Sequence, residues 1–220
     1  MTLPHIDFFD LIIFDMDGVL INSTPCHAQA FADLWQKIGI EGPQYEQIAG
    51  QKTIDAVASV TAPLHPSERQ IQEWVEFKQQ RALEYLAKMP IVYEDSIPAL
   101  EWLTRSGKLI ALGTSASGRS TRLAMKKLNG EKYFSLVVTG DDVANGKPAP
   151  EVYNRIINSM QVNPGKTLVI EDSASGIQAA LAANASVAVV RSGLTVHHPN
   201  FLGSFENLFS LLSFLGLTVE

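Results

Sequence analysis

The sequence predicts an α/β protein in which a doubly wound parallel sheet carries an inserted all-helical domain. Three observations predict this architecture. The apolar run over Phe8–Phe14 is typical of a buried parallel strand, although its periodicity alone also allows a short helix. Residues 23–89 contain helical patterns and no strand pattern. From residue 96 onward, strand and helix patterns alternate, as they do in a sheet covered on both faces through right-handed crossovers.

The inserted segment follows directly after the first strand. It is expected to hold three helices: one that starts at Ser23–Pro25 and stops at Gly39, a short one around Ile54–Ala58, and one that starts at the capping box Ser67–Gln70 and continues to Met89. Pro90 closes this block. We therefore predict a core domain at residues 1–22 and 91–220 and a helical cap domain at residues 23–90.

The remaining elements alternate along the core segment. The expected strands cover residues 109–112, 136–138, 168–170 and 187–190. The expected helices are one capped by Ser96 that stops at Gly107, then helices at 119–128, from Pro150 to Met160, and at 177–184. A last apolar stripe from Phe201 to Leu215 is predicted to be helical and to pack against the core.

Composition limits the functions that the chain can have. It has 220 residues, 46% of them hydrophobic, which is enough for a substantial core. The formal net charge of −6 argues against nucleic-acid binding, so an anionic substrate needs local cations. The single cysteine, Cys26, excludes an intrachain disulfide and fits a reducing compartment. The Phe8–Phe14 run is too short for a membrane span, so we expect a cytoplasmic protein without membrane association. We also expect a monomer, because the core accounts for the apolar stripes.

Polar residues follow the predicted strands in four places: Asp15 and Asp17, Thr114 and Ser115, Lys147, and Glu171 and Asp172. Singly, each has a structural explanation, such as a helix cap or a surface lysine. In a doubly wound sheet, however, the carboxyl ends of the strands share one edge, where ligands bind. Two acids on one strand face repel each other unless a cation or a shared proton relieves them.

Each of these groups also suits one part of a phosphate site. Thr114 and Ser115 precede a helix, whose free N–H groups favour an anion. Pro148 pushes Lys147 toward an extended backbone, which aims its ammonium group. Carboxylate oxygens such as those of Asp172 are ligands that Mg²⁺ selects.

Four motifs occur in order along the chain: Asp15-Met16-Asp17-Gly18-Val19-Leu20, Thr114-Ser115, Gly146-Lys147-Pro148-Ala149-Pro150-Glu151 and Glu171-Asp172-Ser173. In these motifs the chain resembles the haloacid dehalogenase superfamily over nearly its full length. The helical insertion is similar to the cap of the subgroup that contains β-phosphoglucomutase and small sugar-phosphate phosphatases. The resemblance implies a Rossmann-like core with this cap.

The resemblance also implies residue roles. Asp15 is the expected nucleophile, and Asp17 is the expected acid and base. Mg²⁺ is expected at the Asp15 carboxylate, the Asp17 backbone carbonyl and Asp172, with Glu171 as a direct or water-mediated ligand. Lys147 is expected to bind the phosphoryl oxygens together with Thr114 and Ser115, and to keep Asp15 ionised.

Two positions depart from the family pattern. Asn22 stands where many relatives carry an aspartate, and the 50–53 loop lacks the frequent arginine, with Lys52 as its nearest cation. His27 matches a position that lines the site in mutase-like relatives. His27 and Lys52 are therefore predicted substrate contacts, while Cys26 is expected to be a packed thiol.

The leading functional hypothesis is a Mg²⁺-dependent phosphatase that acts on a small phosphorylated metabolite, such as a sugar phosphate, through an aspartyl-phosphate intermediate. A sugar phosphomutase of the β-phosphoglucomutase type is the alternative, because it shares that intermediate. A non-catalytic phospho-acceptor similar to signalling receiver domains is a third hypothesis. Receiver domains are shorter, lack an inserted cap and have no acid at the position of Asp17.

Overall fold

The computed structural model describes residues 5–48 and 53–217. The chain divides into two compact units, Met1–Asn22 with Val92–Glu220, and Ser23–Ile91. We call the first the core unit and the second the cap unit. The functional division into a core and a cap domain, predicted at 23–90, stays a prediction.

The core unit is built on one six-stranded sheet in which every pairing is parallel. Its strands are β1 (Leu11–Phe14), β2 (Leu109–Gly113), β3 (Leu136–Val138), β4 (Thr167–Glu171), β5 (Ser186–Val190) and β6 (Phe201–Phe205). The spatial order is β3-β2-β1-β4-β5-β6, so β1 lies at the centre with β2 and β4 beside it. This is the order of doubly wound sheets, which bind ligands where the order reverses.

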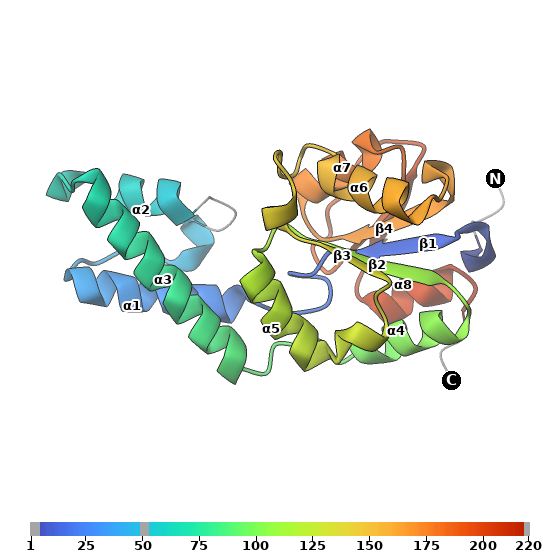
Figure 1. The fold of residues 1–220 in the computed structure, drawn as a ribbon, viewed down its shortest axis with the longest axis horizontal. Helices are drawn as coiled ribbons and strands as arrows, with labels where there is room; N and C mark the ends of the chain where they lie inside the picture. The colour runs from blue at the N-terminus through green and yellow to red at the C-terminus, as the bar shows by residue number, and fades with distance from the viewer. Residues whose placement is uncertain (1–4, 49–52, 218–220) are drawn as a thin grey trace. The chain divides into compact units, whose positions relative to one another are not determined.

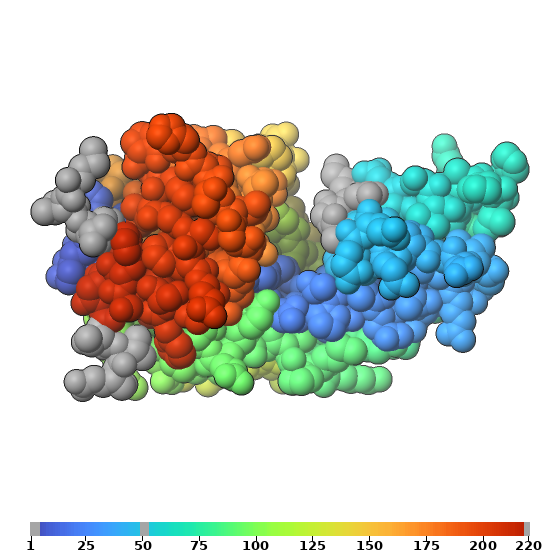
Figure 2. Space-filling model, turned by 180° about the vertical axis from the view of Figure 1, so that it is seen from behind, coloured from blue at the N-terminus to red at the C-terminus, as the bar shows by residue number. Residues whose placement is uncertain are grey.

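Helices cover both faces of this sheet. They are α4 (Ser96–Arg105), α5 (Gly118–Leu128), α6 (Glu151–Met160), α7 (Ala174–Ala182) and α8 (Leu208–Phe214). Helices α6 and α7 lie on one face, and α4 and α8 lie on the other (Figure 1). Seen from behind, the C-terminal segment, in orange and red, packs against the green residues of α4 (Figure 2).

The core residues of β1 explain why this strand is central. All four are fully buried, and Leu11 and Ile13 join the cluster that α6 and α7 cover. The strand is shorter than the predicted Phe8–Phe14 segment, because Ile6–Phe8 form a 3₁₀ turn. This turn buries Ile6 and leaves Phe8 46% exposed.

The C-terminal prediction was partly wrong. Phe201–Phe205 form β6, which pairs with β5, and the helix α8 begins only at Leu208. Two phenylalanines four residues apart share one face of either a strand or a helix, so spacing could not decide between them. Gly203 has φ +138°, a conformation that favours glycine, where the β5–β6 pairing is irregular, and Asn207 caps α8 by accepting a bond from the Ser210 N–H at 2.9 Å.

The predicted cap at Ser96 was also wrong. Ser96 is the first residue of α4 rather than its cap, and Asp95 precedes it. The Ser96 hydroxyl donates to the Leu20 carbonyl at 2.8 Å instead. This contact ties α4 to the turn that follows β1.

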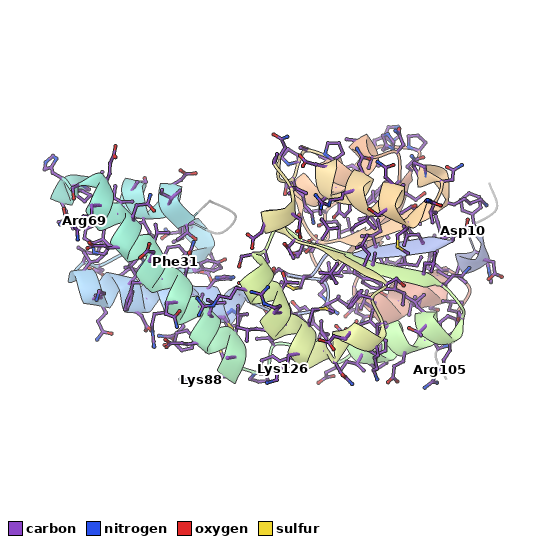
Figure 3. All side chains as sticks on the ribbon, in the orientation of Figure 1. Asp10, Phe31, Arg69, Lys88, Arg105 and Lys126 are labelled. Atoms are coloured by element: carbon purple, nitrogen blue, oxygen red, sulfur yellow. The ribbon has the colours of Figure 1, made fainter. Side chains whose placement is uncertain are left out.

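The described residues of the cap unit form three α-helices, as predicted, and no strand: α1 (Thr24–Ile38), α2 (Thr53–Thr61) and α3 (Glu68–Lys88). The capping box of α3 is present: Gln70 N–H donates to Ser67 Oγ, and Ser67 N–H donates to Gln70 Oε1. Phe31 lies in the apolar cluster that the three helices share (Figure 3). Cys26 is buried, as expected of a packed thiol.

Among the described residues, no helix has both the length and the apolar character that a membrane crossing requires.

Candidate active site

The predicted site residues of the core unit converge at the carboxyl ends of three neighbouring strands. Asp15 follows β1, Thr114 follows β2, and Glu171 ends β4 with Asp172 directly after it. Because β1 pairs with both β2 and β4, these residues lie around the central strand. The site is therefore at the point where the strand order reverses.

Lys147 joins two of these strand ends. Its Nζ donates to Asp15 Oδ1 at 2.5 Å, to Glu171 Oε1 at 2.7 Å and to the Gly113 carbonyl at 3.2 Å. The lysine side chain is 4% exposed, so these ion pairs are shielded from water. Charge-assisted bonds in such a site are stronger than bonds between neutral groups.

A short loop brings Lys147 to this position. Glu151, the first residue of α6, accepts bonds from the Ala144 and Asn145 N–H groups, both at 2.8 Å. The Lys147–Pro148 peptide bond is cis. The side chain of a helix-initiating residue thus fixes the loop that carries the lysine.

Glu171 is a fully buried anchor. Its Oε1 accepts from Lys147 and from the Tyr153 hydroxyl at 2.6 Å, and its Oε2 accepts from the Asp172 N–H at 3.0 Å and from the Ser173 N–H and hydroxyl at 3.2 and 3.0 Å. Burial by itself would raise the pKa of Glu171, but Lys147 and these hydrogen bonds outweigh burial and lower the pKa. Glu171 therefore stays ionised and holds Lys147 in place.

Two other acids of the site, Asp15 and Asp172, lie where their negative charges are unfavourable, so their pKa values are raised. Burial raises the pKa of Asp15 well above its ordinary value, Lys147 opposes the rise, and Glu171 and Asp17 add to it. Burial, followed by the charge of Glu171, raises the pKa of Asp172 to about 7. Lys147 lowers the pKa of Asp15, as expected, but burial works against it, so the expectation that Lys147 keeps Asp15 ionised stays a prediction.

The acid cluster fits a hard divalent cation. One oxygen each from Asp15, Glu171 and Asp172 lie within 4.8 Å of one another. The backbone of Gly18, at φ +76°, passes so close to Asp172 that an added Cβ would lie 1.8 Å from its Oδ2. An all-oxygen donor set suits Mg²⁺, and a bound cation would relieve the raised pKa values of the acids.

The loop between β2 and α5 provides the predicted hydroxyl groups. Thr114 is buried and its Oγ1 accepts from the Ala116 N–H at 3.0 Å, so its hydroxyl hydrogen can point to a further acceptor. Ser115 is exposed. The Gly118 N–H at the start of α5 already donates to Asp141 Oδ2 at 2.8 Å. The Gly118 N–H is therefore already used by Asp141. An anion bound here would instead contact Thr114 and Ser115 of the loop.

Of the two predicted cap contacts, His27 is described and Lys52 lies outside the described residues. His27, on α1, has its Nδ1 3.1 Å from the Nζ of Lys78 on α3. Burial, followed by the charge of Lys78, lowers the pKa of His27 to about 4. The neutral ring thus accepts a bond from the lysine at neutral pH.

Sequence reasoning missed Lys78 and Tyr153. Lys78 is 4% exposed, lies over the Phe31 ring, and burial lowers its pKa to about 8. The sequence contained a sign of this burial, because the helical spacing places Lys78 on the same face of α3 as Val75 and Ala82. Tyr153 lies on the apolar face of α6, where a tyrosine is indistinguishable from an ordinary core residue until its partner is known.

Comparison with known proteins identifies the class of this chain. The sequence profile of the haloacid dehalogenase-like hydrolases matches residues 12–190, which is most of the chain. A phosphorylated carbohydrates phosphatase of Thermotoga maritima is 31% identical over 182 residues, covering 79% of this chain and 81% of that protein. A fructose-1-phosphate phosphatase of Escherichia coli is 28% identical over 193 residues, covering 82% and 95%.

A solved structure shows the same fold. The CbbY protein of Rhodobacter sphaeroides, in complex with phosphate, superimposes with a TM-score of 0.77 at 22% identity, covering 95% of this chain and 100% of that one. The predicted fold class is confirmed. The family match and the phosphatases among its relatives show that the chain is a phosphatase. The chain belongs to the haloacid dehalogenase-like hydrolase family, which confirms the resemblance seen in its motifs.

Proposed function

We propose that this chain is a Mg²⁺-dependent phosphatase that hydrolyses a small phosphorylated carbohydrate through an aspartyl phosphate on Asp15. The observation that supports it most is the contact of Lys147 with both Asp15 and Glu171, beside Asp172. The contact joins a buried carboxylate to a cation within a cluster of acids. Such a site suits a dianionic phosphoryl group only when a metal ion adds positive charge.

In the first half-reaction, a carboxylate oxygen of Asp15 forms a bond to phosphorus as the ester P–O bond breaks. Asp17, two residues along the same turn, gives its proton to the departing alcohol oxygen. Lys147, Thr114 and the Ser115 backbone hold the phosphoryl oxygens, on which charge spreads in the transition state.

In the second half-reaction, water attacks the phosphorus of the aspartyl phosphate. Asp17, now ionised, takes the proton from this water, and the P–O bond to Asp15 breaks to release inorganic phosphate. When bound, Mg²⁺ supplies charge stabilisation for the phosphoryl oxygens. Asp15, the Asp17 carbonyl and Asp172 would hold it, and Glu171 would contribute through water, since both its oxygens already accept several bonds.

The relatives support carbohydrate phosphates as substrates, because the two named above act on phosphorylated carbohydrates and on fructose 1-phosphate. Both are phosphatases, so a phosphomutase is not favoured. The receiver-like hypothesis has no support, because the family is one of hydrolases. The cap unit, with His27 and Lys52 as predicted contacts, is proposed to select among substrates.

The proposal is tested by incubating the purified protein with p-nitrophenyl phosphate and a panel of sugar and polyol phosphates, with and without Mg²⁺. Inorganic phosphate release and isomer formation are scored separately. We expect Mg²⁺-dependent phosphate release from the panel and none from Asp15→Asn. Isomer formation without phosphate release would establish the mutase, and a stable phosphoprotein that releases no phosphate would overturn the enzymatic proposal.

A further inference from the structure

Arg191 has an unusual backbone conformation next to the site. It follows β5, the strand beside β4, and its φ is +67°. A residue other than glycine in this left-handed region is uncommon and costs free energy, so the surrounding structure must hold it there. The Arg191 N–H donates to the Phe205 carbonyl at 2.9 Å, which fixes the residue against the end of β6.

The guanidinium group is held on two sides. Its Nη2 donates to Asp95 Oδ1 at 2.5 Å, and its carbon lies 3.7 Å from the centre of the Tyr93 ring. The second oxygen of Asp95 accepts from the Leu208 N–H at 2.7 Å, and the acid is 5% exposed. A buried acid with two fixed partners gives the guanidinium one defined position.

From this position Arg191 reaches the turn that carries Asp17. Its Nε donates to the Val19 carbonyl at 3.4 Å. The next carbonyl, that of Leu20, accepts from the Ser96 hydroxyl at 2.8 Å and from the Tyr93 N–H at 3.2 Å. The turn therefore receives donors from three residues that lie far from it in the sequence.

Bonds within the turn pass this restraint on to Asp17. The Gly18 N–H donates to the Ile21 carbonyl at 2.8 Å, and the Ile21 N–H donates to the Met16 carbonyl at 3.1 Å. The backbone on both sides of Asp17 is thus closed into one small ring. A donor to the Val19 carbonyl therefore also restrains the backbone that carries Asp17.

We propose that Arg191 is a positioning residue that, with Asp95 behind it, orients the Asp17-bearing turn for proton transfer to the leaving group. This rests on the proposed function, in which Asp17 is the acid. The contacts of the Arg191 side chain described above are with Val19, Asp95 and Tyr93, so its proposed part is to position the turn. Small misplacements of a catalytic group reduce rates strongly, up to about a hundredfold for 1 Å.

The test uses leaving groups that differ in their need for a proton. An alkyl phosphate, such as the best sugar phosphate of the panel, releases a strongly basic alkoxide that must be protonated. p-Nitrophenolate is weakly basic and departs with little assistance. The variant Arg191→Gly removes the guanidinium while keeping a residue that accepts φ +67°. Asp95→Asn is a second variant, which keeps the size of the side chain and removes its charge.

We expect kcat/KM for the sugar phosphate to fall at least about tenfold further than kcat/KM for p-nitrophenyl phosphate in both variants. Arg191→Lys keeps the charge without the planar fork and should not restore the sugar phosphate rate. Arg155→Ala is the matched control, since Arg155 also donates to a carbonyl, that of Asp142 at 2.7 Å. It should leave kcat/KM unchanged for both the sugar phosphate and p-nitrophenyl phosphate.

An equal fall with both substrates in folded Arg191→Gly and Asp95→Asn proteins would overturn the proposal, because that is the effect of a purely structural residue. Full recovery in Arg191→Lys would also overturn it, since charge alone would then suffice. A wild type that hydrolyses neither ester would instead overturn the proposed function, and with it the role of Asp17.

Discussion

Three acids of the site have two different tasks. Glu171 holds Lys147, whereas Asp15 and Asp172 carry charge that a further partner must balance. Glu171 is fixed by its donors and has a lowered pKa, so it holds Lys147. Asp15 and Asp172 have raised pKa values, which marks them as groups whose charge needs a further partner. All three are carboxylates, so their roles differ because of the groups around them: the donors that surround Glu171 lower its pKa, whereas burial raises the pKa of Asp15 and of Asp172.

The proton-transfer role of Asp17 gives a first prediction. Asp17→Asn should lower kcat by about 10²- to 10⁴-fold, because the amide neither donates the proton to the alcohol nor accepts one from water. Mg²⁺ binding should survive, since the proposed metal contact of this residue is its backbone carbonyl. The Mg²⁺-dependent rise of the unfolding temperature measures the binding. If that rise disappears in Asp17→Asn, the side chain is itself a metal ligand.

Lys78 gives a second prediction, about stability. The folded pKa of about 8 lies below the ordinary 10.5, so between these pH values the unfolded chain holds a proton that the folded chain has released. Stability from this group therefore rises with pH through that window and is lowest below pH 8. Lys78→Met should raise the free energy of unfolding at pH 7, by on the order of 3 kcal/mol, and flatten this rise.

Denaturant unfolding at pH 7 and at pH 10 measures both effects of Lys78→Met. Lys37→Met is the matched control, because Lys37 also lies over a ring, that of Phe77, but is exposed. It should change the stability little at either pH. A Lys78→Met protein less stable than the wild type at pH 7 would show that the ammonium stabilises the cap unit.

At the scale of elements, patterns predicted most of the helices and strands because each has its own period and its own stop signal. The box at Ser67–Gln70 and Gly39 after α1 marked helix ends correctly. β6 was misread because Phe201 and Phe205 fit either period, and the pairing with β5 that decides between them is tertiary. Whether a short segment without a start or stop signal becomes a strand or a helix therefore depends on the elements that pack against it.

The site was predictable where its residues follow strands, and not where they lie on helices. Asp15, Thr114 and Asp172 each follow directly after a strand, and the topology of a parallel sheet brings such positions together. Tyr153 and Lys78 lie on apolar helix faces, where periodicity marks them as core. Arg191 reaches Val19 across the sheet edge, a contact that no local pattern encodes.

The packing of α7 on β4 gives a third prediction. Gly176 lies in the first turn of α7, and a Cβ there would be 1.7 Å from Glu171 Oε1. Gly176→Ala should lower the free energy of unfolding by more than about 2 kcal/mol, although alanine favours a helix, because Glu171 must leave its donors. Hydrolysis should fall as well, since Lys147 loses its anchor.

Thermal unfolding and kcat of Gly176→Ala test this expectation. Gly165→Ala is the control, because its added Cβ would come no closer than 3.3 Å to the Asn163 side chain, before β4. It should leave both quantities near their wild-type values. A fully active Gly176→Ala protein would mean that the position of Glu171 does not matter for catalysis.

At the scale of the whole molecule, a cation that binds the acid cluster of the folded state must stabilise the fold. Mg²⁺ at a hundred times its Kd should add about 2.7 kcal/mol to the free energy of unfolding. For a chain of this size that is a rise in Tm of roughly 5 to 10 °C. Chelation should reverse the rise. Asp172→Asn should abolish it, and should raise the Tm in the absence of metal, because Asp172 carries a raised pKa.

Differential scanning calorimetry with and without Mg²⁺ measures these shifts. Asp10→Asn is the control, since Asp10 is an exposed acid that precedes β1, at the other end of the strand from Asp15. It should keep the full response to Mg²⁺. An unchanged wild-type Tm in the presence of Mg²⁺ would contradict a metal site in this cluster.

The central position of β1 has a consequence for biosynthesis. β1 is complete at Phe14, but its two partner strands begin only at Leu109 and Thr167. In the sequence, the whole cap unit comes between β1 and β2. A ribosome therefore exposes this apolar strand long before either neighbour exists. Folding of the sheet has to await most of the chain, and contacts so distant in sequence make it slow. The residues that lead into Asp15 are therefore an apolar segment without its native neighbours during synthesis, which makes it prone to aggregation.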